Sequence, residues 1–177
     1  MKKLSKKQRI IVISAVMAVT IVFVCVYFSG IFEVLSLNRH SSLAVDLLTP
    51  KKSVNLDEYE IYPTEGMGNG TFYVHKDGCH RICIGAYPDS VSPSSKVFAI
   101  SIEGGCADNV FGISVGTSAR EIYAIFDKYN YKIQKGSDDW IVAEKGRISI
   151  AIRLNEAKNA EDIAIRVMPT NIFGVQY

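Results

Sequence analysis

Apolar positions form one long run near the start of the chain. From Ile10 to Phe32 there are 23 residues without a charge, bounded by Arg9 and Glu33. At about 1.5 Å per residue, about 20 helical residues cross the roughly 30 Å of bilayer hydrocarbon. The run therefore predicts a transmembrane helix over residues 10–32.

Basic side chains precede this run and predict its orientation. Residues 1–9 hold five of the 20 lysines and arginines and none of the 18 acids, so they form a basic tail. By the positive-inside rule this tail is cytoplasmic, and everything after about residue 32 lies outside the cell membrane in a single-pass topology. A cleaved signal peptide is the competing hypothesis, with Ser42-Leu43-Ala44 as its small-x-small site, but the apolar core of such a peptide normally has about 7–15 residues.

Beyond the helix the pattern changes twice. Residues 33–58 are mixed in polarity and contain Pro50, which ends any helix begun near Ser42, so they predict a stalk. From Tyr59 onward, short alternating apolar runs are broken by turn residues. This pattern predicts an extracytoplasmic domain over residues 59–177.

The segment TFYVHKDGCHRICIGAY gives the clearest strand signal. Asp77-Gly78 lies between two β-rich runs and favours a two-residue type I′ turn, which needs positive φ at both positions. The turn predicts five cross-strand pairs: Lys76/Cys79, His75/His80, Val74/Arg81, Tyr73/Ile82 and Phe72/Cys83.

The next strand, VFAISIE, is expected to return antiparallel beside the second strand of this hairpin. With Tyr87 roughly opposite Val97, Cys79 falls opposite position 105, next to Cys106. Since the domain is expected to face an oxidising exterior, a Cys79–Cys106 disulfide is predicted. Pairing shifted by about four residues would give Cys83–Cys106 instead; otherwise Cys83 stays reduced and buried.

The second half of the domain predicts one helix followed by strands. Ser118 with Glu121 three residues later is a capping box, and apolar side chains then recur at helical spacing, so a helix is expected over about 118–128. Four strand-like segments follow it. The fold class predicted is α+β, with an antiparallel sheet of about seven strands and one main helix on one of its faces.

The stretch FGISVGTSAREIYAIFDKYNYKI, which begins at Phe111, resembles small exported bacterial modules of the β-lactamase inhibitor protein type and of the outer-membrane assembly lipoprotein type. It is similar as well to uncharacterised membrane-anchored Gram-positive proteins. The resemblance covers about residues 111–168 and is carried by Gly112, Gly116, Ser118 and Glu121. It implies an extracytoplasmic binding or assembly module and brings no catalytic residue with it.

Cysteine and histidine spacing raises a metal hypothesis that strand geometry disfavours. Cys79 and Cys83 are four apart on a strand, about 13 Å, which is too far to share one ion or to form a disulfide. His75 and His80 are expected to face each other on the side away from Cys79. The sequence therefore predicts no metal site, no cofactor and no catalytic residue.

Composition and charge narrow the function classes. The 177 residues are 48% hydrophobic and 21% charged with a net charge of +2, while residues 10–177 carry 15 − 18 = −3, so a nucleic-acid partner is not expected. The function predicted is a membrane-anchored module that binds a protein, a peptide or an envelope polymer. The alternatives are a cell-envelope hydrolase or thiol enzyme using Cys83 or Cys79, and an accessory subunit of a membrane complex.

Overall fold

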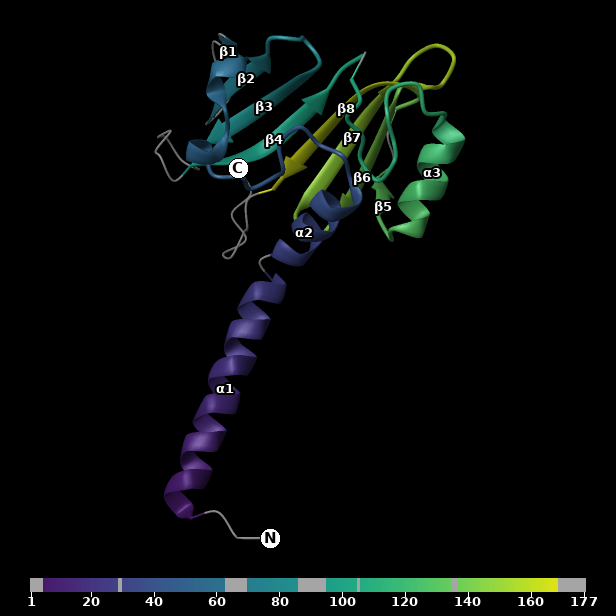
Figure 1. Ribbon diagram of the computed structural model, residues 1–177. Helices are drawn as coiled ribbons and strands as arrows, with labels where there is room; N and C mark the ends of the chain where they lie inside the picture. Colours follow the sequence, from purple (N-terminus) through teal and green to yellow (C-terminus); the bar gives the residue numbers. More distant parts are fainter. Residues whose placement is uncertain are drawn as a thin grey trace.

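The computed structural model describes residues 5–28, 30–62, 70–85, 95–104, 106–134 and 137–168. A long helix projects from a domain built on one antiparallel sheet (Figure 1). The helices are α1 (Lys6–Phe28), α2 (Ile31–His40) and α3 (Ala119–Lys128), with short 3₁₀ turns at Lys51–Ser53 and Leu56–Glu58. The strands are β1 (Tyr59–Tyr62), β2 (Thr71–His75), β3 (His80–Gly85), β4 (Lys96–Ile102), β5 (Lys132–Gln134), β6 (Trp140–Lys145), β7 (Ile148–Leu154) and β8 (Ala160–Val167).

The predicted helix over residues 10–32 is two helices in the structure. α1 ends at Phe28, and Gly30 precedes α2 with a φ of 65°, a left-handed conformation that glycine adopts at no steric cost. Within the described residues, α1 is the one helix long and apolar enough to cross a membrane, over Lys7–Cys25. Length and composition of this kind fit a membrane span and a signal sequence equally.

The sheet consists of two consecutive four-stranded meanders. Its order is β1-β2-β3-β4-β8-β7-β6-β5, so the last strand of one meander pairs with the last strand of the other. Every pairing is antiparallel, which confirms the predicted fold class; the structure has eight strands where about seven were expected. On β7, buried residues alternate with half-buried ones, so one face of the sheet holds the core.

The hairpin register is confirmed, whereas the predicted turn type is wrong. The structure pairs Phe72, Tyr73 and Val74 of β2 with Cys83, Ile82 and Arg81 of β3. The loop between β2 and β3 has four residues, and a hydrogen bond from the Gly78 N–H to the His75 carbonyl closes its first turn. Gly78 has a φ of 74°, while Asp77 is not among the described residues with positive φ, so the turn is not type I′.

The pairing of β3 with β4 differs from the prediction by two residues. Arg81 lies opposite Ser101 and His80 opposite Ile102, and the Glu103 N–H donates to the Cys79 carbonyl. Cys79 therefore lies level with position 103 and not with 105. A shift of two residues leaves every side chain on its expected face, because side chains alternate with a period of two.

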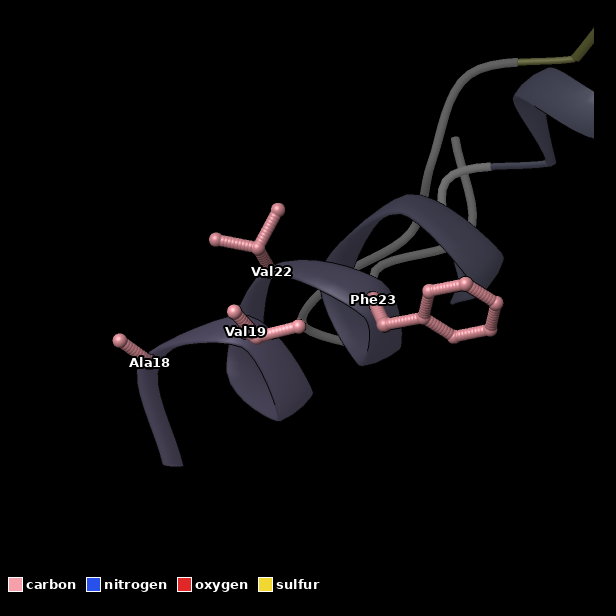
Figure 2. A pocket seen from close by; sticks show the side chains of 4 residues that line it. All are labelled: Ala18, Val19, Val22 and Phe23. Carbon is pink, nitrogen blue, oxygen red and sulfur yellow. The ribbon is translucent and has the colours of Figure 1, made fainter. Parts of the chain in front are cut away.

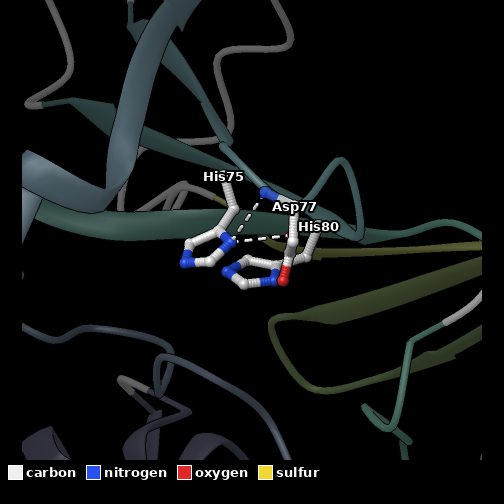
Figure 3. Close-up of side chains that lie close together, drawn as sticks. All are labelled: His75, Asp77 and His80. Atoms are coloured by element: carbon white, nitrogen blue, oxygen red, sulfur yellow. Dashed lines mark hydrogen bonds and ion pairs between the residues drawn. The ribbon is translucent and has the colours of Figure 1, made fainter.

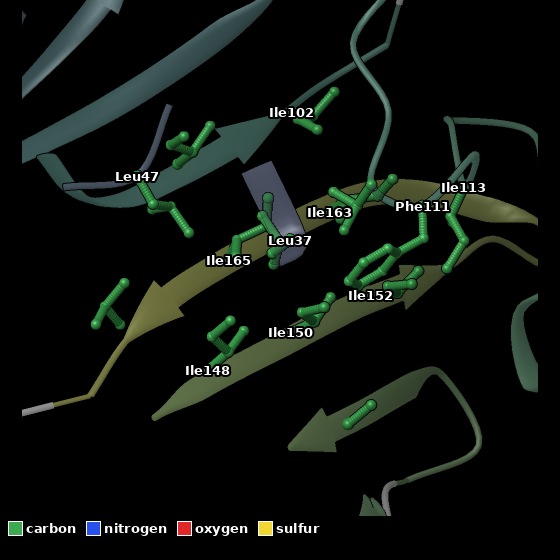
Figure 4. Close-up of a cluster of buried hydrophobic side chains, with 14 of the residues drawn as sticks. Leu37, Leu47, Ile102, Phe111, Ile113, Ile148, Ile150, Ile152, Ile163 and Ile165 are labelled. Carbon is green, nitrogen blue, oxygen red and sulfur yellow. The ribbon is translucent and has the colours of Figure 1, made fainter. Parts of the chain in front are cut away.

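Residues 33–58 do not form a free stalk, because α2 and the chain after it contribute to the core. Val34, Leu37 and Leu47 are buried in the same cluster as the isoleucines of the sheet. Figure 4 shows Leu37 and Leu47 among side chains of β4, β7 and β8. The compact part of the protein therefore begins with α2, well before Tyr59.

The capping box predicted at the start of α3 is present. The Glu121 N–H donates to the Ser118 hydroxyl oxygen, and the Ser118 N–H and hydroxyl donate to the Glu121 carboxylate. These bonds from Ser118 hold the pKa of the Glu121 carboxyl below its ordinary value. Ile122 and Phe126 of the same helix are fully buried, so the cap fixes a helix that is anchored in the core.

Replacing Ser118 by alanine is expected to lower the free energy of unfolding by about 1 kcal/mol, because one orphan backbone N–H loses its acceptor. This loss in the free energy of unfolding should become smaller in acid. The pKa of Glu121 is lower in the folded chain than its ordinary value, so the hydrogen bonds of its carboxylate stabilise the fold above that ordinary pKa. This stabilisation disappears as the pH falls through the pKa of the folded chain. Urea unfolding of the detergent-solubilised chain, followed by the fluorescence of Trp140, measures this. Ser118→Thr keeps the acceptor and should remain near the parent; an equal loss in both variants would contradict the capping argument.

Candidate functional site

A pocket of about 460 Å³ lies between the chain that leads into β1 and the β2–β3 hairpin. Residues between Leu43 and Tyr59 line one side of it, and His75 and His80 line the other. Because its lining includes imidazole, carboxylate, amide and hydroxyl groups, the pocket differs from the apolar core around it. It is the concave surface on which the chemically versatile side chains of the described chain converge.

Two histidines stand side by side in this pocket. His75 ends β2 and His80 begins β3, and their rings stack with centroids 4.6 Å apart and planes at 24° (Figure 3). The rings face each other, as the hairpin register predicted. His80 is 4% exposed, so it is a buried polar side chain that requires partners.

Four oxygen-bearing side chains surround the two imidazoles. The Tyr59 hydroxyl lies 2.7 Å from His80 Nε2, and a carboxylate oxygen of Asp77 lies 2.7 Å from His75 Nδ1. Asp108 approaches His80 Nδ1 to 3.8 Å, and Glu58 approaches His75 Nε2 to 3.6 Å. The pair is therefore set among three carboxylates and one phenol.

Burial and local hydrogen bonds determine the protonation of these groups. Burial lowers the pKa of His80, and this effect exceeds the opposing attraction of Asp108. Burial, and after it the charge of Glu58, raises the pKa of Tyr59 to about 12. A backbone hydrogen bond from Cys79 lowers the pKa of Asp77. Near neutral pH the site thus combines a neutral His80, a protonated Tyr59 and an ionised Asp77.

The hairpin loop explains how Asp77 reaches the histidines. Asp77 accepts a hydrogen bond from the Cys79 N–H at 2.7 Å, and its own N–H points at His75 Nδ1 at 3.4 Å. This short turn folds the carboxylate back over the end of β2, as Figure 3 shows. Sequence reasoning did not place Asp77, Tyr59 or Asp108 beside the histidines. For Asp77 the letters HKDGCH contain a local signal, because they place two histidines and an aspartate within six residues.

The predicted disulfide partners lie together as free thiols. The Cys106 thiol donates a hydrogen bond to the Cys79 carbonyl. Burial, with a further contribution from a hydrogen bond to the Cys79 side chain, raises the pKa of Cys106 to about 12. The disulfide itself stays a prediction, and the structure brings its two residues into contact.

Cys83 is buried and also keeps its proton. It is 1% exposed on β3, and burial raises its pKa to about 12. A nucleophilic cysteine needs a lowered pKa and access to substrate. Neither property is found at Cys83, so its environment is that of a core residue.

A second hollow lies on the surface of α1 and is wholly apolar. It is lined by Ala18, Val19, Val22 and Phe23 (Figure 2). These side chains offer no polar atom, so the hollow has no candidate chemistry. It belongs to the exposed apolar surface of the helix.

The fold and the pocket define an α+β domain with a histidine-lined concavity, joined to an apolar helix. No protein-family model matches the chain, and a search of curated proteins finds no match. The fold is similar to the crystal structure of a cysteine-rich secretory protein, SAV1118, from Staphylococcus aureus subsp. aureus Mu50, with a TM-score of 0.46 and 14% sequence identity. The similarity covers 68% of this chain and 44% of that chain, so this chain spans less than half the length of that protein. A likeness of this size carries no argument about activity or location.

Proposed function

We propose that this protein is a single-pass membrane protein that displays its α+β domain outside the cell and acts by binding a ligand. The observation that carries the proposal is α1. Every residue of the apolar stretch Lys7–Cys25 is exposed, and none of them belongs to the buried core. An uncovered apolar helix of this length is accommodated by a bilayer, and the basic residues before it favour a cytoplasmic N-terminus.

The packing of α2 supports retention of the helix over its removal as a signal peptide. Cleavage after Ala44 would remove Val34 and Leu37, both of which belong to the buried core. It would also remove Asn38, whose side-chain amide donates to the Leu47 carbonyl and accepts from the Leu47 N–H. The domain therefore depends on residues that a cleavage at this site would discard.

The connection between α1 and the domain is short. A Cβ atom on Gly30 would lie 2.7 Å from Cγ of Arg147, so the turn between β6 and β7 packs directly on the end of the helix. A Cβ atom on Gly146 would likewise lie 3.0 Å from Cδ of Glu33 on α2. In the proposed topology the domain sits at the membrane surface, and its ligand is reached there and not at the end of a long tether.

The ligand is proposed to bind in the histidine-lined pocket. Ligand sites are typically concave and combine apolar walls with a few convergent polar groups. Cys83 is buried and its pKa is raised to about 12, so the thiol-enzyme alternative gains no support from the environment of this residue. Binding, not turnover, is the activity that the site supports best.

Membrane fractionation and external protease treatment of intact cells test the topology. We expect the full-length chain in the membrane fraction after an alkaline wash, with the domain digested from outside and the N-terminal residues protected. N-terminal sequencing of the membrane-bound product should find residues before Ser42. A mature chain that begins after Ala44, or a domain protected in intact cells, would refute the proposed topology.

A further inference from the structure

We propose that His75, Asp77 and His80 form a binding site for a divalent transition-metal cation of the zinc class, with a coordination position open to the pocket. One ligand atom from each residue lies within 4.8 Å of the other two. Imidazole nitrogen and carboxylate oxygen are the donors that zinc and its neighbours in the first transition row accept. This inference rests on the histidine-lined pocket of the proposed function and not on the membrane topology, so the metal titration and the topology experiment fail separately.

The three ligand atoms are near a binding arrangement, and side-chain rotation completes it. Metal bonds of about 2.0–2.2 Å place tetrahedral ligand atoms about 3.4 Å apart, so a pair of ligand atoms at the 4.8 Å limit has to close by about 1.4 Å. The stacked rings must turn, because a metal lies in the plane of each imidazole that binds it. Rotation about the bond from Cβ to a histidine ring is soft, since such torsions have broad minima. Metal binding therefore replaces the ring stack and the contact between His75 and Asp77 without moving the strands.

Tyr59 is placed to orient His80 for coordination. Metal-binding histidines usually donate the N–H of the other ring nitrogen to an oxygen, which fixes the tautomer. The Tyr59 hydroxyl lies 2.7 Å from His80 Nε2 and can accept that N–H. His80 Nδ1 then keeps its lone pair on the side where Asp108 approaches. Tyr59 is a positioning residue in this site and not a ligand.

The charge around the two histidines favours a cation. Glu58, Asp77 and Asp108 all approach an imidazole to within 4.0 Å. Among the residues that the structure describes, none of these three carboxylates forms an ion pair with a lysine or arginine. A divalent cation would meet a site with excess negative charge, and three protein ligands leave room for a fourth ligand from the pocket, as in catalytic and exchangeable zinc sites.

Metal titration of the full-length chain in detergent, after treatment with a chelator, tests the site. We expect one equivalent of Zn²⁺ by calorimetry and by elemental analysis, and Co²⁺ should give visible absorption without a thiolate charge-transfer band. His75→Gln and Asp77→Asn should each weaken Zn²⁺ binding by roughly tenfold or more. Both positions are more exposed than His80, so these variants avoid replacing a buried side chain.

Matched controls separate this site from other donors on the chain. His40→Gln removes an exposed histidine on α2 and should leave the affinity unchanged. The double variant with Cys79→Ser and Cys106→Ser should also bind one equivalent. Unchanged affinity in His75→Gln or in Asp77→Asn, with parental unfolding midpoints, would overturn the proposal, and so would loss of binding in the cysteine variant.

Discussion

Replacing Leu37 by alanine is expected to lower the free energy of unfolding by about 2–5 kcal/mol, the range found when a buried leucine is truncated. Leu37 is 0% exposed, and it lies among isoleucines of β7 and β8 (Figure 4). The truncation leaves a cavity between α2 and the sheet that the surrounding branched side chains cannot fill. Urea unfolding of the detergent-solubilised chain, followed by Trp140 fluorescence, gives the difference.

Leu35→Ala is the matched control for this experiment. Leu35 is two residues away on the same helix, has the same side chain and is 57% exposed. Its replacement should change the free energy of unfolding by no more than about 0.5 kcal/mol. Equal effects of the two replacements would mean that α2 does not dock on the sheet, and the case against cleavage after Ala44 would fail with it.

The behaviour of α2 shows where sequence reasoning reached its limit in the fold. The strands after residue 139 and the capped helix α3 follow from repeated local patterns that extend over several positions. α2 has ten residues and buries only Val34 and Leu37. Two apolar positions are too few to show whether a short segment is a helix packed on the core or a polar connection. The burial of Val34 and Leu37 depends on tertiary packing, which the sequence pattern of α2 does not contain.

The pairing of β3 with β4 illustrates a second limit. A shift of two residues keeps the alternation of buried and exposed side chains, so the hydrophobic pattern cannot choose between the two registers. The β2–β3 pairing was predictable because a short turn fixes it, whereas a connection of ten residues, 86–95, joins β3 to β4. Cys106 lies beside Cys79 despite the two-residue difference in register, because both residues lie just beyond the paired strands.

The candidate site was predictable in one part only. The facing of His75 and His80 follows from the hairpin register. Asp77 depends on the actual turn geometry, while Tyr59 and Asp108 are brought in from 21 residues before and 28 residues after His80. Contacts of that separation arise from the packing of the sheet and are not encoded in local spacing.

Oxidation of Cys79 and Cys106 to a disulfide is expected to raise the free energy of unfolding by about 3 kcal/mol, because it closes a loop of about 28 residues in the unfolded chain. The Cys106 thiol already contacts Cys79, so little rearrangement of the backbone is needed. Thiol–disulfide exchange proceeds through a thiolate, and the pKa of Cys106 is raised to about 12, so oxidation should be slow near neutral pH and faster at higher pH.

Alkylation under denaturing conditions, followed by intact mass measurement, counts the thiols. The sequence contains four cysteines, so the oxidised chain should react at two of them, Cys25 and Cys83, and the reduced chain at four. Cys106→Ser should abolish the stabilisation by oxidant, whereas Cys25→Ser, on the apolar helix, should retain it. Four reactive thiols after treatment with oxidant would reject the disulfide, and a bridge that persists in Cys79→Ser would assign it to Cys83 and Cys106 instead.

Because Cys79 donates its backbone N–H to Asp77, the bridge would also hold the turn that presents Asp77 to the histidines. Oxidation is therefore expected to tighten Zn²⁺ binding by His75, Asp77 and His80 as well as to stabilise the fold.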